Sequence, residues 1–184
     1  MNNMLTEIVK NLKRIAIIGN GGGGKTTLAK SLAAKYSLPL THVDSIQYLA
    51  GMKIRDTLET TRILNLKADE DSWLIDGFGT YEVMQRRFHL ADKIIFVDFP
   101  IWRHYLWCTK RQIKSLWTPR LELPANCNEA TLSYTIKLYK ILWRVHTQIR
   151  PKLIDLFKQI EFKNKVIKIK NVKQWNCVFF SGDI

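Results

Sequence analysis

The sequence has few cysteines, few acidic residues in its second half and no long apolar segment. Its three cysteines, Cys108, Cys127 and Cys177, lack C-x-x-C spacing. Three scattered cysteines without this spacing argue against a zinc site or a disulfide framework and favour free thiols in a reducing cytoplasm. Uninterrupted apolar runs cover only a few residues, so we expect neither a signal peptide nor a membrane-spanning helix. The sequence therefore predicts a soluble, cytoplasmic protein without a membrane partner.

The shortage of acidic residues is uneven along the chain. Residues 1 to 100 carry 13 Lys and Arg against 11 Asp and Glu, a net charge of +2. Residues 101 to 184 carry 16 against 5, a net charge of +11. Phosphate binding, nucleic-acid binding and a solvated surface all use such cations, and composition does not choose among them.

A glycine cluster lies between a short apolar run and a helical pattern. The stretch Arg14 to Thr27 reads RIAIIGNGGGGKTT and satisfies the phosphate-loop pattern G-x-x-x-x-G-K-[ST]. In that pattern glycines let backbone N–H groups point at a phosphate chain, the lysine reaches the terminal phosphates and the hydroxyl holds magnesium. The pattern predicts a site for ATP and Mg²⁺ formed by Gly19, Asn20, Gly21, Gly22, Gly23, Gly24, Lys25, Thr26 and Thr27.

The same letters also allow a dinucleotide-binding motif. Gly19, Gly21 and Gly24 spell G-x-G-x-x-G, and Asp44 follows at about the 20-residue spacing of a ribose-binding acid. The Lys-Thr-Thr sequence after Gly24 has a role in a phosphate loop and none in the dinucleotide motif. It therefore favours the phosphate loop.

Hydrophobic periodicity predicts alternating strands and helices in one domain, residues 1 to 184. Aliphatic strands separated by helices indicate a three-layer α/β/α fold of the P-loop NTPase type, with a parallel sheet of about five strands and a helical lid region at about residues 101 to 127. Strands are expected at 15–18, 40–44, 72–77, 93–98 and 166–169, the last central or near an edge. Helices are expected at the N-terminus, at 25–36, from Thr57 through Leu66, after Pro100, and from about Glu129 to Ile160 with an interruption at Pro151.

The helix after Pro100 shows apolar residues at three- and four-residue spacing. We expect these residues to face the core, which leaves the basic residues between them free to face solvent or a ligand. The apolar set is Trp102, Tyr105, Leu106, Thr109, Ile113 and Leu116, and the basic set is Arg103, Lys110, Arg111 and Lys114.

Three acidic residues, Asp44, Asp76 and Asp98, end predicted strands. Because the carboxyl ends of parallel strands meet at one edge of a sheet, we expect all three to lie near Gly19. Acids beside a triphosphate are costly unless they hold magnesium, meet cations or orient a hydroxyl. An acidic residue after a strand can also cap the next helix instead of serving a ligand site, and we expect this capping role most for Asp98.

The stretch Trp73 to Pro100, WLIDGFGTYEVMQRRFHLADKIIFVDFP, resembles an adenylate kinase segment in which a strand ends in Asp-Gly-Phe and an Ala-Asp precedes the next strand. With the phosphate loop, the strand ending in Asp44 and the tryptophan-rich helix after Pro100, nearly the whole chain resembles the adenylate kinase-related topology-modulation proteins of the P-loop kinase superfamily. The resemblance implies a phosphotransferase, like the nucleoside monophosphate kinases, that passes the γ-phosphoryl group of ATP to a nucleotide or another small acceptor.

The resemblance also implies roles for single residues. Lys25 and Thr26 would bind the triphosphate and magnesium, and Asp76 would orient magnesium through water. Asp44 would contact the acceptor or take a proton from its hydroxyl group. Arginines that contact phosphates are implied at Arg87 and, in the lid, at Arg111 and Arg120.

Two positions depart from the family pattern. Gly79-Thr80 stands where adenylate kinases have Pro-Arg, and Trp107 stands where topology-modulation proteins have arginine. Both departures weaken AMP as the acceptor, whose identity the sequence does not reveal. Residues between the second strand and the next helix are predicted to line the acceptor pocket, with ordinary loop packing equally open: Tyr48, Met52 and Arg55.

Two other functions stay open at the level of sequence. One is a nucleotide-gated, DNA topology-modulating protein whose basic C-terminal half binds nucleic acid. The other is a relic with a degenerate site, which the intact Gly24, Lys25, Thr26 and Asp76 argue against and Gly79 keeps open.

Overall fold

The computed structural model describes residues 12–115, 117, 131–181 and 184. The predicted N-terminal helix, Arg120 and Cys127 lie outside these ranges. A parallel sheet forms the centre, with the strand order β2-β5-β1-β6-β7. The strands are β1 (Arg14–Gly19), β2 (Leu40–His42), β5 (Trp73–Asp76), β6 (Lys93–Val97) and β7 (Val166–Ile169). This is the expected five-strand sheet, and β7 lies at an edge, one of the two positions left open for it.

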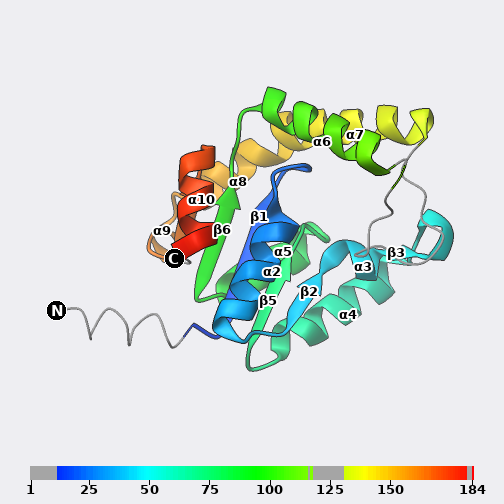
Figure 1. Ribbon diagram of the computed structural model, residues 1–184. Helices are drawn as coiled ribbons and strands as arrows, with labels where there is room; N and C mark the ends of the chain where they lie inside the picture. The colour runs from blue at the N-terminus through cyan, green and yellow to red at the C-terminus, as the bar shows by residue number, and fades with distance from the viewer. Residues whose placement is uncertain (1–11, 116, 118–130, 182–183) are drawn as a thin grey trace.

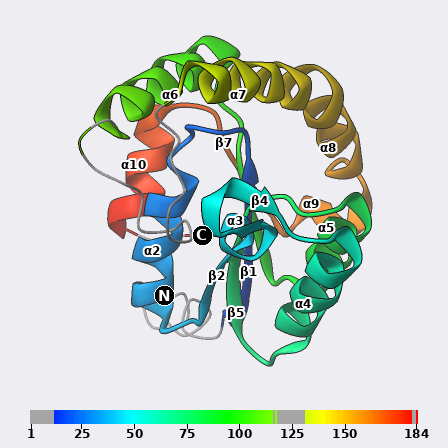
Figure 2. The ribbon, with the colours of Figure 1, turned by 90° about the vertical axis from the view of Figure 1, so that its right-hand side faces the viewer.

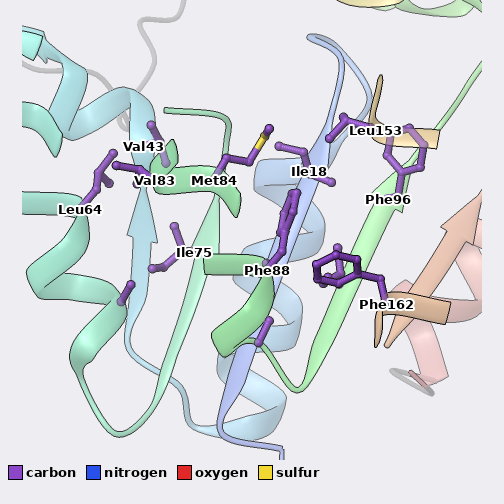
Figure 3. Packing of buried hydrophobic residues seen from close by; sticks show 14 of the residues in the cluster. Ile18, Val43, Leu64, Ile75, Val83, Met84, Phe88, Phe96, Leu153 and Phe162 are labelled. Carbon is purple, nitrogen blue, oxygen red and sulfur yellow. The ribbon is translucent and has the colours of Figure 1, made fainter. Parts of the chain in front are cut away.

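Helices cover both faces of the sheet, so the predicted three-layer α/β/α fold is confirmed (Figures 1 and 2). One face packs against α2 (Lys25–Tyr36) and α10 (Val172–Ser181). The other packs against α4 (Thr57–Asp69), α5 (Tyr81–Leu90), α8 (Arg150–Leu156) and α9 (Ile160–Lys163). Each residue from Ile15 to Ile18 is fully buried, because side chains on both sides of β1 meet a helical layer. Figure 3 shows the cluster on the second face, to which Ile18, Phe88 and Phe162 belong.

The second predicted strand is shorter than expected. β2 ends at His42, and the chain continues as the short helix α3 (Val43–Gln47). The strands β3 (Tyr48–Leu49) and β4 (Lys53–Ile54) follow as a small antiparallel hairpin around the 3₁₀ turn η1 (Ala50–Met52). Asp44 therefore lies in the first turn of α3 and is exposed, and His42 takes the place at the strand end that was predicted for Asp44. The sheet partner β5 ends opposite His42, at Asp76, so nothing pairs with a longer β2.

The helix α4 begins as its sequence predicts. The side chain of Asp56 accepts hydrogen bonds from the backbone N–H groups of Leu58 and Glu59 at 2.9 and 3.0 Å. These bonds satisfy donors that have no partner within the first turn.

Two helices cross above the carboxyl ends of β1 and β6, namely α6 (Ile101–Ser115) and α7 (Leu132–Arg144) (Figure 1). The expectation for α6 was wrong about its faces. Its buried residues are His104, Cys108 and Gln112, whereas Trp102 is 56% exposed and Ile113 is 53% exposed. The buried side of α6 packs on the glycine loop and on α7, and that contact accepts polar and small side chains.

The interruption near Pro151 lies earlier than predicted. The five residues Val145–Ile149 form a π-helix, η2, between α7 and α8, and Pro151 itself occupies the first turn of α8. Proline has no N–H and its ring crowds the preceding helical turn, so the turn before it widens. The Arg150 N–H donates to the Val145 carbonyl, five residues back. Ile160 begins α9 instead of ending the long helix.

Within the described ranges, no helix combines the length and the apolar character needed to cross a bilayer.

Candidate active site

The glycine loop connects β1 to α2, at the carboxyl edge of the sheet. The Lys25 ammonium group bends back and donates to the Asn20 carbonyl at 3.0 Å. Gly24 precedes the first turn of α2 in a left-handed conformation, and within the described part of the chain no side chain caps the N–H groups of that turn. These N–H groups, the positive end of the helix dipole and the ammonium group together form a site for an anion.

The helices above the loop hold it in place. Asn20 donates through Nδ2 to the Leu142 carbonyl of α7 at 2.9 Å and accepts from the Gly21 N–H at 2.8 Å. Gly22 has a φ of +72°, and a Cβ built there would lie 2.7 Å from the Cys108 sulfur of α6. Only glycine fits this position without strain, because both the backbone conformation and the close approach of α6 exclude a side chain.

His104 of α6 is the second polar contact with the loop. Its Nδ1 lies 2.7 Å from the Gly21 carbonyl oxygen. Because a carbonyl only accepts, Nδ1 carries the hydrogen in this bond. Burial lowers the pKa of His104 to about 4, with a smaller lowering from the Lys25 charge, and the Gly21 bond raises it only in part. The imidazole is therefore neutral at physiological pH.

Asp76 ends β5 beside α2. Its Oδ2 accepts from the Thr26 hydroxyl at 3.2 Å and lies 3.2 Å from His42 Nδ1. Its other oxygen, Oδ1, is buried and has no hydrogen-bond partner among the described residues. A buried carboxylate oxygen without a partner is costly, and a bound cation would relieve that cost. The predicted pair of Thr26 and Asp76 is thus brought together.

Arg87 of α5 lies fully buried below the loop that follows Asp76. Its Nη2 donates to the carbonyls of Gly77 at 2.5 Å and Phe78 at 3.1 Å. Burial lowers the pKa of Arg87 to about 10, and the Asp76 carboxylate raises it in part. Its Nε and Nη1 have no partner in the described residues. Arg87 therefore supports the loop, and its contact with a phosphate stays a prediction.

Asp98 directly follows β6 and lies among cations. Its Oδ2 lies 3.1 Å from Arg150 Nη2 and 3.3 Å from the Lys168 ammonium. Both carboxylate oxygens are engaged, since Oδ1 accepts from Arg150 Nε. His146 lies near this cluster, and burial followed by the Arg150 charge lowers the pKa of His146. Among the described residues Asp98 therefore pairs with cations and caps no helix.

Other predicted residues are more scattered. Arg111 lies about one turn beyond Cys108 on α6, with its Nε buried and unpartnered among the described residues. Thr27 is exposed on α2. Arg55 donates to the Ile46 carbonyl at 2.8 Å and to Glu59 at 2.7 Å, so it joins α3 to α4. Tyr48 is half-buried in β3, and Met52 lies in η1. The phosphate role of Arg120 falls outside the described residues.

The two departures from the family pattern have structural roles. Thr80 caps α5 by accepting from the Val83 N–H, and Gly79 before it has a φ of +78°. Trp107 packs its ring edge-on against Phe99, with the ring centroids 5.1 Å apart. Both positions therefore stabilise the scaffold of this protein.

Sequence reasoning missed two histidines of the site. His42 was hidden because the strand was extended to Asp44, although it stands in register with Asp76. His104 was passed over because the apolar residues of α6 were taken as its core face. No sequence signal marked His104, because its neighbours along the chain are Arg103 and Tyr105 and its contact with Gly21 arises only from packing.

No family model matches the sequence, and no curated protein matches it closely enough to be significant. Solved structures do match. A shikimate kinase from Acinetobacter baumannii, in complex with shikimate, aligns with a TM-score of 0.52 and 13% identity over 97% of this chain and 99% of that chain. A shikimate kinase from Aquifex aeolicus aligns with a TM-score of 0.43 and 16% identity over 77% of this chain and 98% of that one.

The chain has the fold of the P-loop kinases. At this level of identity the first alignment establishes the fold, and it confirms the P-loop kinase architecture expected from the sequence. Open parallel α/β sheets generally hold ligands at the carboxyl ends of their strands, which is the edge where Lys25, Thr26 and Asp76 gather. The narrower resemblance to topology-modulation proteins stays a prediction, as do the roles of the single site residues.

Proposed function

We propose that this protein is a small-molecule kinase that transfers the γ-phosphoryl group of ATP to a small acceptor, with Mg²⁺ as the metal ion. One observation carries the proposal. Next to an uncapped helix N-terminus and the Lys25 ammonium, the Thr26 hydroxyl meets a buried carboxylate whose second oxygen has no partner among the described residues.

The residues present fit a magnesium ion. Mg²⁺ prefers hard oxygen ligands and is held in kinases by one or two protein oxygens together with water and phosphates. The Thr26 hydroxyl and the free Asp76 Oδ1 are such oxygens. When bound, the metal would neutralise part of the charge on the phosphates.

The phosphate loop would bind and align the triphosphate. Lys25 can exchange the Asn20 carbonyl for phosphate oxygens, because the bond that holds its ammonium group is local and made to the loop itself. Catalysis in phosphoryl transfer comes from alignment and from cations near the transferred group. Arg111 and Arg87 are the proposed additional cations, with the lid helices closing over the site.

The acceptor would bind between the loop after Asp76 and α3. Asp44 is exposed in the first turn of α3, where it can accept a proton from an acceptor hydroxyl group. Since the similar structure holds shikimate, a small hydroxyl-bearing acceptor belongs in the test alongside nucleoside monophosphates. The nucleic-acid alternative gains no support from the fold.

The test is an acceptor screen that measures ADP formation above the rate of ATP hydrolysis. We expect one small hydroxyl- or phosphate-bearing compound to raise ADP formation in wild type. Replacing Lys25→Ala should lower that rate by at least about 100-fold, because the cation over the transferred group is lost. Lys152→Ala, an exposed lysine of α8, is the matched control and should keep the rate. Transfer that survives in Lys25→Ala would contradict the proposal.

A further inference from the structure

The outer face of α6 and α7 exposes apolar side chains that neither the core nor the proposed site uses. On α6 these are Trp102, Leu106 and Ile113, and Trp117 follows one turn later with 76% exposure. On α7, Ile136 is 50% exposed and Trp143 is 56% exposed. Scattered single apolar residues on a surface are ordinary, but these five on two packed helices, with Trp117 two residues beyond α6, mark an interaction surface.

The side chains on α6 form one stripe. At 100° per residue, Trp102, Leu106 and Ile113 lie within roughly 40° of one another around the helix axis. The buried residues His104 and Cys108 lie on a different side of the same helix. α6 therefore buries a side of polar and small residues and leaves its apolar stripe uncovered.

The contact between the two helices places their stripes side by side. Tyr105 of α6 meets Tyr139 of α7 with ring centroids 5.1 Å apart, and the Thr109 hydroxyl bonds to the Tyr139 hydroxyl. We call this line of contact the seam. At 100° per residue, the seam residues of each helix lie between its buried side and its exposed apolar residues. Trp102, Leu106 and Ile113 thus border the seam from one side, and Ile136 and Trp143 border it from the other. Figures 1 and 2 show the two helices side by side along the outer edge of the molecule.

Basic residues flank the stripes on both sides. On α6, Lys110 and Lys114 lie on the side of the apolar stripe that is farther from the seam. On α7 the same position is taken by Lys137, Lys140 and Arg144. All five are exposed, and neither helix contains an Asp or a Glu. We define the hairpin face as the six apolar residues together with these five cations.

The chemistry of the hairpin face selects its partner. A surface with Trp, Leu and Ile at its centre and cations at its rim matches an anionic lipid bilayer, where apolar groups enter the headgroup boundary and cations meet lipid phosphates. A nucleic acid would use the cations but gains nothing from exposed Ile and Leu. A second copy would bring two cationic rims together, which like-charge repulsion disfavours.

We propose that the hairpin face docks this protein onto the surface of membranes that contain anionic phospholipids, in contrast to the sequence-based expectation of no membrane partner. The glycine loop contacts the opposite, buried side of the hairpin through His104 and Leu142. Docking therefore leaves the phosphate loop uncovered by lipid. The inference is independent of the proposed kinase activity, since it rests on the surface alone.

Vesicle flotation tests the proposal directly. One set of vesicles contains phosphatidylcholine alone and the other includes about 30% phosphatidylserine, at about 0.1 M salt. We expect wild type to float with the anionic vesicles and not with the neutral ones. Ile113→Gln with Trp143→Gln should reduce binding at least about tenfold, and so should Lys110→Glu with Lys140→Glu.

Two matched controls separate the hairpin face from general surface effects. Leu58→Gln with Ile160→Gln removes apolar residues that are 80% and 85% exposed elsewhere. Lys152→Glu with Lys163→Glu makes the same change in net charge on α8 and α9. Both should bind anionic vesicles like wild type, with unchanged melting temperatures in all four variants.

Several results would overturn the proposal. Absence of wild-type binding to anionic vesicles is one, and equal binding by the hairpin and control variants is another. A third is a charge variant that loses vesicle binding while the Ile113→Gln, Trp143→Gln variant keeps it. If wild type then binds a single-stranded oligonucleotide as tightly as it binds the anionic vesicles, the face is a nucleic-acid surface instead. A dimer in solution that the same substitutions dissociate would identify a second copy.

Discussion

At the scale of single residues, Asp76 is the carboxylate with room for a cation in the proposed site. One of its oxygens meets Thr26 and the other has no partner among the described residues. Asp76→Asn should therefore weaken the binding of ATP in the presence of Mg²⁺ at least tenfold, by about 1.4 kcal/mol or more, while binding without Mg²⁺ changes little. Calorimetric titrations with and without the metal measure both quantities.

The contrasting variant is Asp44→Asn. Since Asp44 is exposed on α3 and does not contact the phosphate loop, it should bind nucleotide like wild type and transfer phosphate more slowly. Equal loss of binding in both variants would contradict the division between a metal-side and an acceptor-side carboxylate.

His104 predicts a pH dependence of stability. Its pKa in the folded protein is about 4, below the usual 6.5, because the imidazole is buried. Between these values the unfolded chain binds a proton that the folded protein does not, so stability is lost as pH falls from 6.5 towards 4. The loss between pH 7 and pH 5 amounts to about 2 kcal/mol from this group. His104→Asn keeps a donor for the Gly21 carbonyl without titrating.

Urea unfolding at pH 7 and pH 5 checks this prediction. The free energy of unfolding should fall more between the two pH values in wild type than in His104→Asn. His146, whose pKa is also lowered, contributes equally to both proteins and cancels in the comparison. The same pH dependence in both would show that His104 does not cause it.

Residue identities in the site were predictable where backbone chemistry requires them. A loop that presents N–H groups to phosphates needs glycine, so Gly19 to Thr26 could be found from spacing alone. His42 and His104 could not, since histidine serves equally well as a packed side chain or a ligand. Their hydrogen bonds to Asp76 and Gly21 depend on how distant elements pack.

At the scale of elements, the close packing of α7 on the glycine loop can be tested. A Cβ added at Gly21 would lie 2.8 Å from Leu142 Cδ2. Gly21→Ala should destabilise the fold by about 1 to 2 kcal/mol, and Leu142→Ala by about 2 to 5 kcal/mol. Together they should cost about 1 kcal/mol less than the sum, because truncating Leu142 makes room for the new methyl group.

Gly22→Ala is the control for this double-mutant cycle. Its added Cβ would meet Cys108 and the backbone of His104, and its φ is +72°. Leu142→Ala should therefore not rescue it. Additive effects for Gly21 and Leu142, measured by denaturant unfolding, would show that α7 does not press on the loop.

Element positions follow from periodicity, but the face that an element buries depends on its neighbours. The spacing of apolar residues located α6 correctly and assigned its core side wrongly, because α6 packs on glycines and on α7 rather than on the sheet. The π-helix before Pro151 likewise depends on how η2 is held between α7 and α8. A proline in the sequence predicts that a helix is interrupted nearby, but it does not specify which helical turn widens.

At the scale of the whole molecule, the net charge of +13 opposes compaction. Raising sodium chloride from about 0.02 to 0.2 M screens this repulsion and should stabilise the fold by on the order of 1 kcal/mol. Chloride is the suitable anion, because sulfate or phosphate could bind the loop and stabilise the protein by mass action. A fall in the free energy of unfolding with salt would show that ion pairs outweigh the repulsion.

The global fold was predictable because the aliphatic strands leave few alternatives. Strands such as Ile15 to Ile18 are buried on both faces, which requires helices on both sides of a parallel sheet. The edge position of β7 and the helix α10 were not predictable from local pattern. Strand order depends on crossover connections that no local sequence signal specifies.

The central claim is that the loop between β1 and α2 binds the phosphates of a nucleotide through Lys25. Isothermal titration of ATP with Mg²⁺ tests it most directly. Wild type should give a saturable heat at one site per chain, and Lys25→Ala should bind at least about tenfold more weakly with an unchanged melting temperature. No heat from either ATP or GTP, or equal affinity in Lys25→Ala, would contradict the account.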